Sequence, residues 1–347
     1  MSTVSKTTVS KSAAPRYSVI LGNLGNTCDR FLPSGYKDQP TKAEQFRRAG
    51  SIRGVTGVEL VGSWDITVDA VAETRQHLAD AKLQLVSIIP DVFSQKRWGR
   101  GSFTSRDPAI RRAAVTAVTE MMDVAAELGC DLINLWPGQD GFDYPFQGDF
   151  ANIQEWWTTG LQACADHRRD VRIALEYKSK EPRTHSYLAT AADTLLVALA
   201  TGRDNVGVCI DSGHAIMAHE NLGASVALLA AHRKLFHIHC NDNYRGWDDD
   251  MIVGSVHFAE YAELLYWLRR SGYAGWLSMD QYPYREDGRD AVDASVRFIA
   301  GLERKLERFG WERFDAVVAS GDSVAMCTLL RELLGISDEA QAEGRGR

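Results

Sequence analysis

Short apolar runs alternate with longer amphipathic stretches over most of the chain. The apolar runs are rich in β-branched residues, which is typical of buried strands. In the stretches between them, apolar residues recur at spacings of three and four, which indicates amphipathic helices. Eight runs are predicted as strands, namely YSVILGN (17–23), GVELVG (57–62), LQLVSII (83–89), LINLWP (132–137), RIALEYK (172–178), VGVCID (206–211), LFHIHC (235–240) and GWLSMD (275–280).

One helical stretch shows clear boundary signals. DPAIRRAAVTAVTEMMDVAAELG (107–129) opens with an aspartate that can cap the helix and a proline tolerated in its first turn, and it ends in glycine. Eight strands that alternate with such helices predict an α/β fold, a (β/α)8 TIM barrel. A doubly wound parallel sheet is the alternative. The glycines of LGNLGNT (21–27) do not have the dinucleotide-binding spacing, which favours the barrel.

The ends of the chain differ in composition from its middle. Residues 1–15 are rich in Ser, Thr and Lys and lack the apolar segment of a signal peptide, so we expect a disordered N-terminal arm. Residues 16–308 are predicted to form the catalytic barrel. Residues 309–347 are predicted to form a C-terminal helical extension and a flexible tail, with SVAMCTLLRELLG (323–335) as the clearest helix.

Composition and charge narrow the class of protein. A hydrophobic content of 45% over 347 residues indicates a globular protein with a sizeable core. A net charge of −7 disfavours nucleic acid and anionic membrane surfaces as partners. No apolar stretch approaches the roughly 18 residues of a membrane span. The six cysteines are scattered without a CxxC pair, as expected in a reducing compartment. We therefore expect a cytoplasmic protein with neither nucleic acid nor membrane as partner.

Ionisable residues gather where the last four predicted strands end. In TIM barrels the carboxyl ends of the strands carry the active site. An oxygen-rich set of ligands with one imidazole suits Mn²⁺, Mg²⁺ or Co²⁺, and converging carboxylates repel one another unless a cation is bound. The strand ends supply Glu176 and Lys178, then Asp211 with His214 one turn later, then His237 and His239, and finally Asp280.

The acidic run after the seventh strand suggests a second ion. Asp248 and Asp250 lie two positions apart and are predicted to bind it together with His214, while Asp211 bridges both ions. The alternative is that WDDD (247–250) is a solvated turn and that each strand-end residue caps a helix or anchors a loop. His237 is interpreted mainly as a structural histidine or one that supports a metal ligand. The combination over four consecutive strands favours the metal centre.

The same motifs, in this order, resemble the xylose isomerase-like TIM barrels, in particular xylose isomerase and L-rhamnose isomerase. The resemblance covers about residues 85 to 290, and the stretch from residue 235 to residue 250 looks closer to L-rhamnose isomerase, where histidine replaces an acidic ligand. It is carried by the segment 101–141, which ends near a tryptophan, and by EYKSKEPR (176–183), DSGHA (211–215), LFHIHCNDNYRGWDDD (235–250) and SMDQYP (278–283).

The resemblance implies an aldose–ketose isomerase that acts on a free monosaccharide with one or two divalent ions, Mn²⁺ before Mg²⁺ or Co²⁺, in a homodimer or homotetramer. Lys178 would contact the carbonyl-derived oxygen of the sugar. The implied first ion is held by Glu176, Asp211, His239 and Asp280, and the second by Asp211, His214, Asp248 and Asp250. The catalytic candidates are Lys178, Glu176, Asp280 and His214, and the substrate-binding candidates are Trp136, Phe93, Trp64 and His237.

One departure keeps other functions open. Xylose isomerase has a ring-opening histidine on its second strand, and LVGSWDI (60–66) has none, although Asp65 is present. A ketose 3-epimerase would use Glu176 and Asp280 as its proton-shuttling pair. The barrel subunit of a C-glycoside deglycosidase would need a small partner subunit. An apurinic-site-endonuclease-like phosphodiesterase is disfavoured by the net charge. A non-enzymatic sugar-binding protein would leave Lys178 unexplained.

Overall fold

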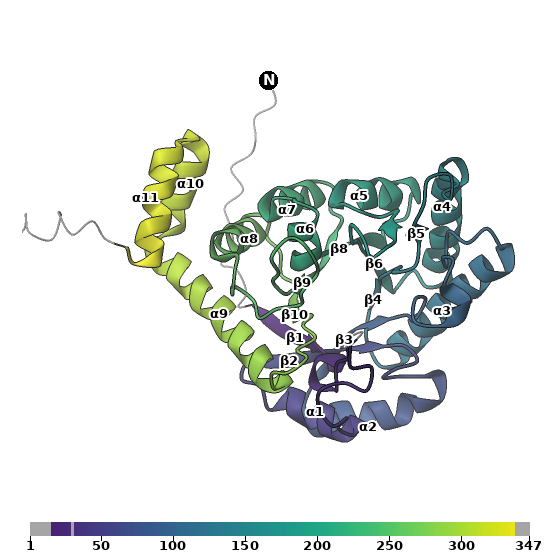
Figure 1. Cartoon of the computed structure of the whole chain (residues 1–347). Helices are drawn as coiled ribbons and strands as arrows, with labels where there is room; N and C mark the ends of the chain where they lie inside the picture. The colour runs from purple at the N-terminus through teal and green to yellow at the C-terminus, as the bar shows by residue number, and fades with distance from the viewer. Residues whose placement is uncertain (1–14, 29–30, 337–347) are drawn as a thin grey trace, which may run out of the picture.

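The strands close into a parallel barrel. The structure is a computed structural model that describes residues 15–28 and 31–336. Neighbouring strands follow the order β1-β10-β9-β8-β6-β4-β3-β2, which confirms the TIM barrel and excludes the open doubly wound sheet (Figure 1). The barrel strands are β1 (Arg16–Ile20), β2 (Val55–Val61), β3 (Gln84–Ile89), β4 (Leu132–Leu135), β6 (Arg172–Glu176), β8 (Val206–Asp211), β9 (Leu235–Cys240) and β10 (Trp276–Met279).

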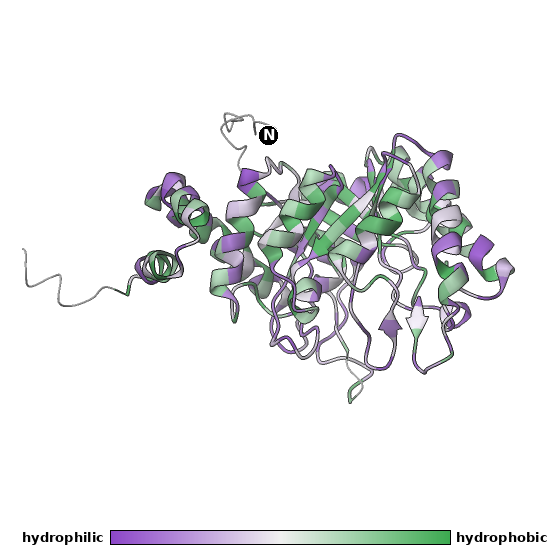
Figure 2. Ribbon diagram, turned by 90° about the horizontal axis from the view of Figure 1, so that it is seen from above, coloured by the Kyte–Doolittle hydropathy of each residue, from purple (hydrophilic) through white to green (hydrophobic). Residues whose placement is uncertain are grey.

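The helices cover the outside of the barrel, and their polar faces point outward (Figure 2). Strand residues are green in this view, as expected for strands buried on both faces. The helical elements are η1 (Leu21–Leu24), α1 (Lys42–Gly50), η2 (Val68–Ala70), α2 (Val71–Ala81), η3 (Lys96–Trp98), α3 (Pro108–Glu127), α4 (Phe150–His167), α5 (Ala191–Ala200), α6 (Ser212–Met217), α7 (Leu222–Ala231), α8 (Phe258–Arg270), α9 (Gly288–Phe309), α10 (Trp311–Ser320) and α11 (Ser323–Leu334).

Helix α3 shows how sequence signals become structure. Its cap, Asp107, accepts a hydrogen bond from the backbone N–H of Ala109 at 2.8 Å, and Pro108 stands in the first turn as predicted. In the layer between the barrel and the α3–α4 side, Phe103 stacks on Trp157 with ring centroids 5.0 Å apart, and both side chains are buried. Aromatic packing of this kind anchors the helical layer to the barrel.

A small two-stranded sheet and a helix pair stand outside the barrel. The small sheet pairs β5 (Gly141–Phe142) with β7 (His185–Ser186) in antiparallel fashion, on the side where the loops after the strands gather (Figure 2). The pair α10–α11 projects from the end of α9, at the left of Figure 1. The expected arm and the tail after residue 336 lie outside the described residues, apart from Pro15 of the arm.

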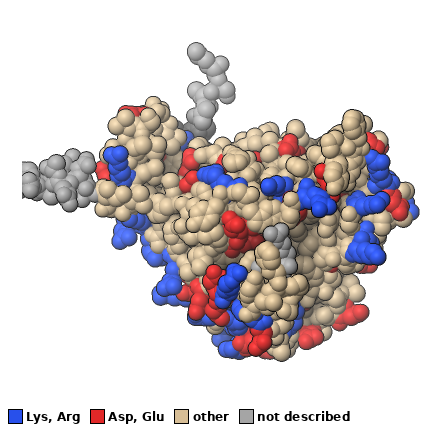
Figure 3. Space-filling model, viewed as in Figure 1, with Lys and Arg blue, Asp and Glu red and all other residues tan. Residues whose placement is uncertain are grey.

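Two general properties bear on partners. Basic and acidic side chains are interspersed over the face shown in Figure 3. No helix among the described residues has the length and apolar content needed to cross a lipid bilayer. The division into arm, barrel and extension stays a prediction from the sequence.

Candidate metal centre and substrate cavity

Four consecutive strands bring four candidate ligands together. Glu176, Asp211, His239 and Asp280 offer ligand atoms that all lie within 4.8 Å of one another. Nδ1 of His239 lies 3.4 Å from Oε2 of Glu176 and 3.2 Å from Oδ2 of Asp280. The parallel register pairs Asp211 with His239, and Asp280 directly follows β10, so all four stand at the carboxyl end of the barrel. We call these four residues the quartet.

The carboxylates of the quartet differ in their electrostatics. Burial, followed by the negative charges of Asp248 and Asp280, raises the pKa of Asp211 to about 7. Burial also raises the pKa of Asp280. Burial opposes the ionisation of Glu176, yet the imidazole of His239 outweighs it and lowers the pKa of that carboxyl. Without a cation, the quartet therefore retains protons near neutral pH.

The unsatisfied polar atoms of the site test whether a cation fits. A buried polar atom without a partner normally indicates a bound water or ion. A set of carboxylates with one imidazole nitrogen matches divalent ions such as Mn²⁺. Among the described residues, the buried atoms without a hydrogen-bond partner include Nδ1 of His239, Nδ1 of His214, Oδ1 of Asp248 and Oδ1 of Asp280. The quartet therefore fits a divalent cation.

A second group of possible ligands adjoins the quartet. Asp211, His214 and Asp248 also offer ligand atoms within 4.8 Å of one another. Nε2 of His214 lies 3.0 Å from Oδ2 of Asp248, and its Nδ1 lies 3.2 Å from Oε1 of Glu176. Burial opposes protonation of His214, but Asp211 and Asp248 raise its pKa to about 10. Asp250 stands outside this group and lines the cavity from a left-handed backbone conformation, with φ of 50°.

Lys178 places a buried positive charge beside both groups. Its Nζ lies 3.0 Å from Oδ2 of Asp248 and 2.7 Å from Oε1 of Glu181. The ammonium also lies over the rings of Trp136 and Trp247, at 5.3 and 5.4 Å from their centroids. Burial disfavours the charge, but Asp248 and Glu181 outweigh it and raise the pKa of Lys178 above its ordinary value. Lys178 is therefore a permanent cation at the site.

A cavity of about 180 Å³ opens in front of these charges. One wall is aromatic, because Phe93 packs edge-on against Trp64 and Trp136, with centroid distances of 5.5 and 4.7 Å. All three aromatic residues, which the sequence predicted to bind substrate, line the cavity. Its other lining residues are Ile20, Val61, Ile89, Glu176, Lys178, His214, Asp248, Asp250, Asp280 and Tyr282.

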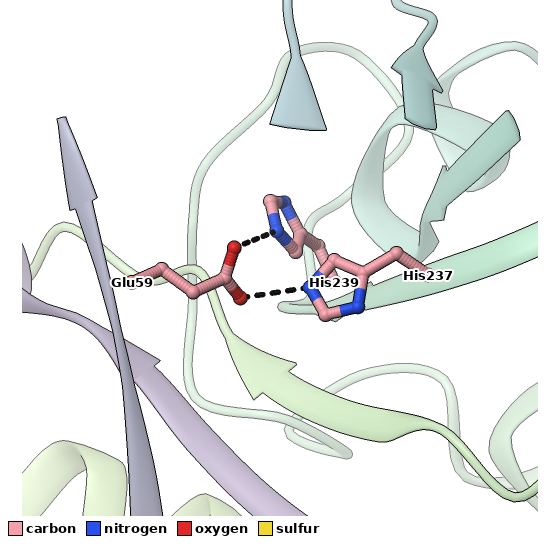
Figure 4. Close-up of side chains that lie close together, drawn as sticks. All are labelled: Glu59, His237 and His239. Carbon is pink, nitrogen blue, oxygen red and sulfur yellow. Dashed lines mark hydrogen bonds and ion pairs between the residues drawn. The ribbon is translucent and has the colours of Figure 1, made fainter. Parts of the chain in front are cut away.

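His237 does not border this cavity, which corrects its place among the substrate-binding candidates. It is 1% exposed and packs against His239, with its Nε2 2.8 Å from Oε1 of Glu59 (Figure 4). Asp65 does not line the cavity either, because it pairs with Lys42 and accepts a hydrogen bond from the backbone N–H of Val61.

Sequence reasoning missed three residues that contact candidate ligands. Asn134 donates a hydrogen bond to Oε2 of Glu176 at 2.6 Å, and Asn241 donates one to Oδ2 of Asp211 at 2.8 Å. Glu59 lies 3.3 Å from Nε2 of His239. Only Glu59 had a visible signal, since a lone glutamate within the apolar run GVELVG must find partners if that run is buried.

Comparisons with known proteins agree with the fold. Residues 46–302 match the family model described as xylose isomerase-like TIM barrel. The chain belongs to this family. It is similar to the xylose isomerase of Thermus thermophilus, with 30% identity over 233 residues, or 65% of this chain and 60% of that enzyme. The xylose isomerase of Ruegeria pomeroyi is 26% identical over 222 residues, or 61% of this chain and 50% of that enzyme. The chain thus spans about 60% or less of these relatives.

Solved structures share the fold at lower identity. A D-tagatose 3-epimerase-like protein superposes with a TM-score of 0.64 at 17% identity, covering 84% of this chain and 99% of its own. L-ribulose 3-epimerase gives 0.63 at 17% identity, with 85% and 96% covered. The IolI protein, solved with a zinc atom, gives 0.60 at 16% identity, with 84% and 98% covered. At such identities the likeness concerns the fold alone.

Proposed function

We propose that this protein is a divalent-metal-dependent enzyme that interconverts an aldose and a ketose, with a free monosaccharide as substrate. Membership of the xylose isomerase-like family and the fit of the quartet to a divalent cation support this proposal. The observation that carries it is the ammonium of Lys178, held by Asp248 at the edge of the cavity. A permanent cation there can stabilise an oxygen that gains negative charge.

The reaction needs no external oxidant. One hydrogen moves from C2 to C1 of the aldose and the hydroxyl proton moves from O2 to O1, so that the carbonyl passes from C1 to C2 and atoms and electrons balance within the substrate. A divalent ion bound at the quartet would supply Lewis-acid polarisation of two adjacent sugar oxygens. Lys178 would donate a hydrogen bond to the oxygen that carries the developing charge, and it would keep its own proton.

The remaining residues would position the sugar. Trp136, with Phe93 packed edge-on against it, presents an apolar wall that would exclude water from one side of the sugar ring. The group of Asp211, His214 and Asp248 is a candidate for a second ion, and Asp250, which lines the same cavity, stays the proposed fourth ligand. A cytoplasmic location, a homo-oligomer and a small partner subunit stay predictions from the sequence.

A ketose 3-epimerase is the second candidate, and one observation favours it. Two carboxylates of the quartet line the cavity with opposite tendencies, because the pKa of Glu176 is lowered by His239 and that of Asp280 is raised by burial. Such a pair can act as base and acid on a carbon next to a carbonyl. An epimerase of this kind has no evident need for the buried cation Lys178, which is why we prefer the isomerase.

A substrate screen by NMR tests the proposal. The protein is stripped of metal, reloaded with Mn²⁺ or Mg²⁺ and incubated in D₂O with free aldoses and ketoses, and the metal is then removed with chelator. A metal-dependent aldose–ketose pair is the expected result. Deuterium in the product at the migrating position would indicate a proton relay, and its absence a hydride shift. Appearance of a C3 epimer alone would establish the second candidate, and turnover only of an oxidised glycoside would indicate the deglycosidase.

A further inference from the structure

Glu59 lies inside the barrel, beside His239 of the quartet. It stands in the middle of β2, and its side chain has no exposed surface. Its two oxygens face two residues of β9, with Oε1 2.8 Å from Nε2 of His237 and Oε2 3.3 Å from Nε2 of His239 (Figure 4). The hydroxyl of Ser87 on β3 also donates to Oε2. Three donors from two strands therefore converge on one carboxylate.

The hydrogen bonds determine where His239 carries its proton. An ionised carboxylate only accepts hydrogen bonds, so the nitrogen that faces Glu59 must carry hydrogen. This nitrogen is Nε2 of His239, which leaves Nδ1 of a neutral ring with its lone pair free. Nδ1 is the atom that faces Glu176 and Asp280, and it lacks a hydrogen-bond partner among the described residues. A neutral His239 that binds an ion at the quartet would therefore bind it through Nδ1.

The contacts of Glu59 hold its carboxylate in place, because Oε2 faces both Nε2 of His239 and the hydroxyl of Ser87. His237 also holds Oε1, so the carboxylate cannot rotate away from His239 without breaking a short hydrogen bond. The two imidazole rings pack edge to face, with centroids 5.0 Å apart. The contacts with Glu59 explain why β9 carries two histidines at alternate positions.

We propose that Glu59 is a positioning residue of the metal centre, which holds His239 in the Nε2–H form so that Nδ1 can bind the ion, and that His237 anchors Glu59 in turn. This inference rests on the proposed metal centre and not on the identity of the sugar. A carboxylate that accepts a hydrogen bond from a ligating histidine fixes its orientation and raises its basicity, so its removal weakens metal binding.

The decisive variant is Glu59→Gln, which keeps the size of the side chain and removes its charge. A glutamine turns an N–H donor toward one of the two imidazoles, so it cannot accept from both. The control is Glu73→Gln, because Glu73 forms an exposed contact with His77, at 3.4 Å, on helix α2. Mn²⁺ affinity is measured by titration against a competing chelator. We expect Glu59→Gln to bind about 10- to 100-fold more weakly and Glu73→Gln to bind as the wild type does.

A spectroscopic readout separates positioning from a general loss of structure. In zinc-loaded protein, ¹⁵N–¹H spectra of the histidine rings should show a slowly exchanging Nε2–H for His239, and Glu59→Gln should shift or remove this signal. Unfolding in urea without metal reports whether the variant folds. Should Glu59→Gln fail to fold, His237→Asn is measured instead, since it frees one oxygen of Glu59 and should reduce affinity by a smaller factor.

Three outcomes would overturn the inference in different ways. Unchanged Mn²⁺ affinity in a folded Glu59→Gln or His237→Asn variant would show that the carboxylate does not position the ligand. Loss of one whole equivalent of tightly bound metal, with the remainder unaffected, would mean that Glu59, His237 and His239 themselves hold an ion. Absence of metal binding in the wild type would refute the proposed function together with this inference.

Discussion

Replacing Lys178 by methionine tests the proposed chemistry most directly. Methionine fills a similar volume between Trp136 and Trp247 but carries no charge. Loss of a donor to a developing negative charge costs about 2.7–4 kcal/mol of transition-state stabilisation, or about 10²–10³ in kcat. We expect this fall in kcat with a KM that changes by only a few-fold, because Lys178 acts mainly on charge that appears in the transition state.

The same substitution should also weaken the fold when no metal is present. A charge pair at 3.0 Å, the distance from Lys178 to Asp248, is worth about 5.5 kcal/mol at an effective dielectric constant of about 20. Without the lysine, Asp248 keeps only His214 as a close cationic partner. The free energy of unfolding should therefore fall by about 3 kcal/mol. Divalent metal should restore much of it by supplying a replacement charge.

Steady-state kinetics on the sugar that the NMR screen identifies check the expected fall in kcat. Urea unfolding with and without Mn²⁺ checks the expected fall in the free energy of unfolding. Lys180→Met is the matched control, since Lys180 stands two residues further along and does not line the cavity. A Lys178→Met enzyme with the kcat of the wild type would refute the role of the ammonium in charge stabilisation. An equal loss in Lys180→Met would assign the effect to the loop.

Three further predictions concern protons, substrate and core. Mn²⁺ binding should strengthen from about pH 6 to about pH 8. The pKa values of Asp211 and His214 are raised to about 7 and about 10, so the metal must displace protons from these ligands. Calorimetry in two buffers at pH 7 should show proton release on binding, and binding without proton release would contradict the prediction. Trp136→Ala should remove about 1–2 kcal/mol of substrate binding and raise KM roughly 5- to 30-fold, and an unchanged KM would place the sugar elsewhere. Trp157→Ala should lower the free energy of unfolding by about 3–5 kcal/mol, because the buried ring stacks on Phe103; a loss below about 1 kcal/mol in urea would contradict this packing.

Local patterns of the sequence were sufficient to predict the barrel and most of the ionisable residues that gather at the ends of its strands. The alternation of strands and helices can be predicted from apolar residues at spacings of two, three and four, because these spacings depend only on local backbone geometry. The ends of the strands could be assigned to one face because parallel strands share it, and the quartet assembled as this reasoning required. Phe93 and Trp136 were instead implied by the family resemblance, and both line the cavity.

Other features depend on how distant segments meet. The sequence placed Asp248 and Asp250 together, but the left-handed backbone at Asp250 and the ion pair of Asp248 with Lys178 direct the two carboxylates differently. Asn134 and Asn241 carry no signal of their own, because amides near strand ends are common in any loop-rich region.

Glu59 shows most clearly where local reasoning ends. The run GVELVG shows that the glutamate lies on the same strand face as Val61, and therefore which way it points. Its partner His237 lies 178 residues away in the chain. The two meet only because the barrel closes and its interior brings side chains from opposite strands into contact. Strand period is a local property of the chain, whereas the partner of a buried charge is decided by the whole tertiary structure.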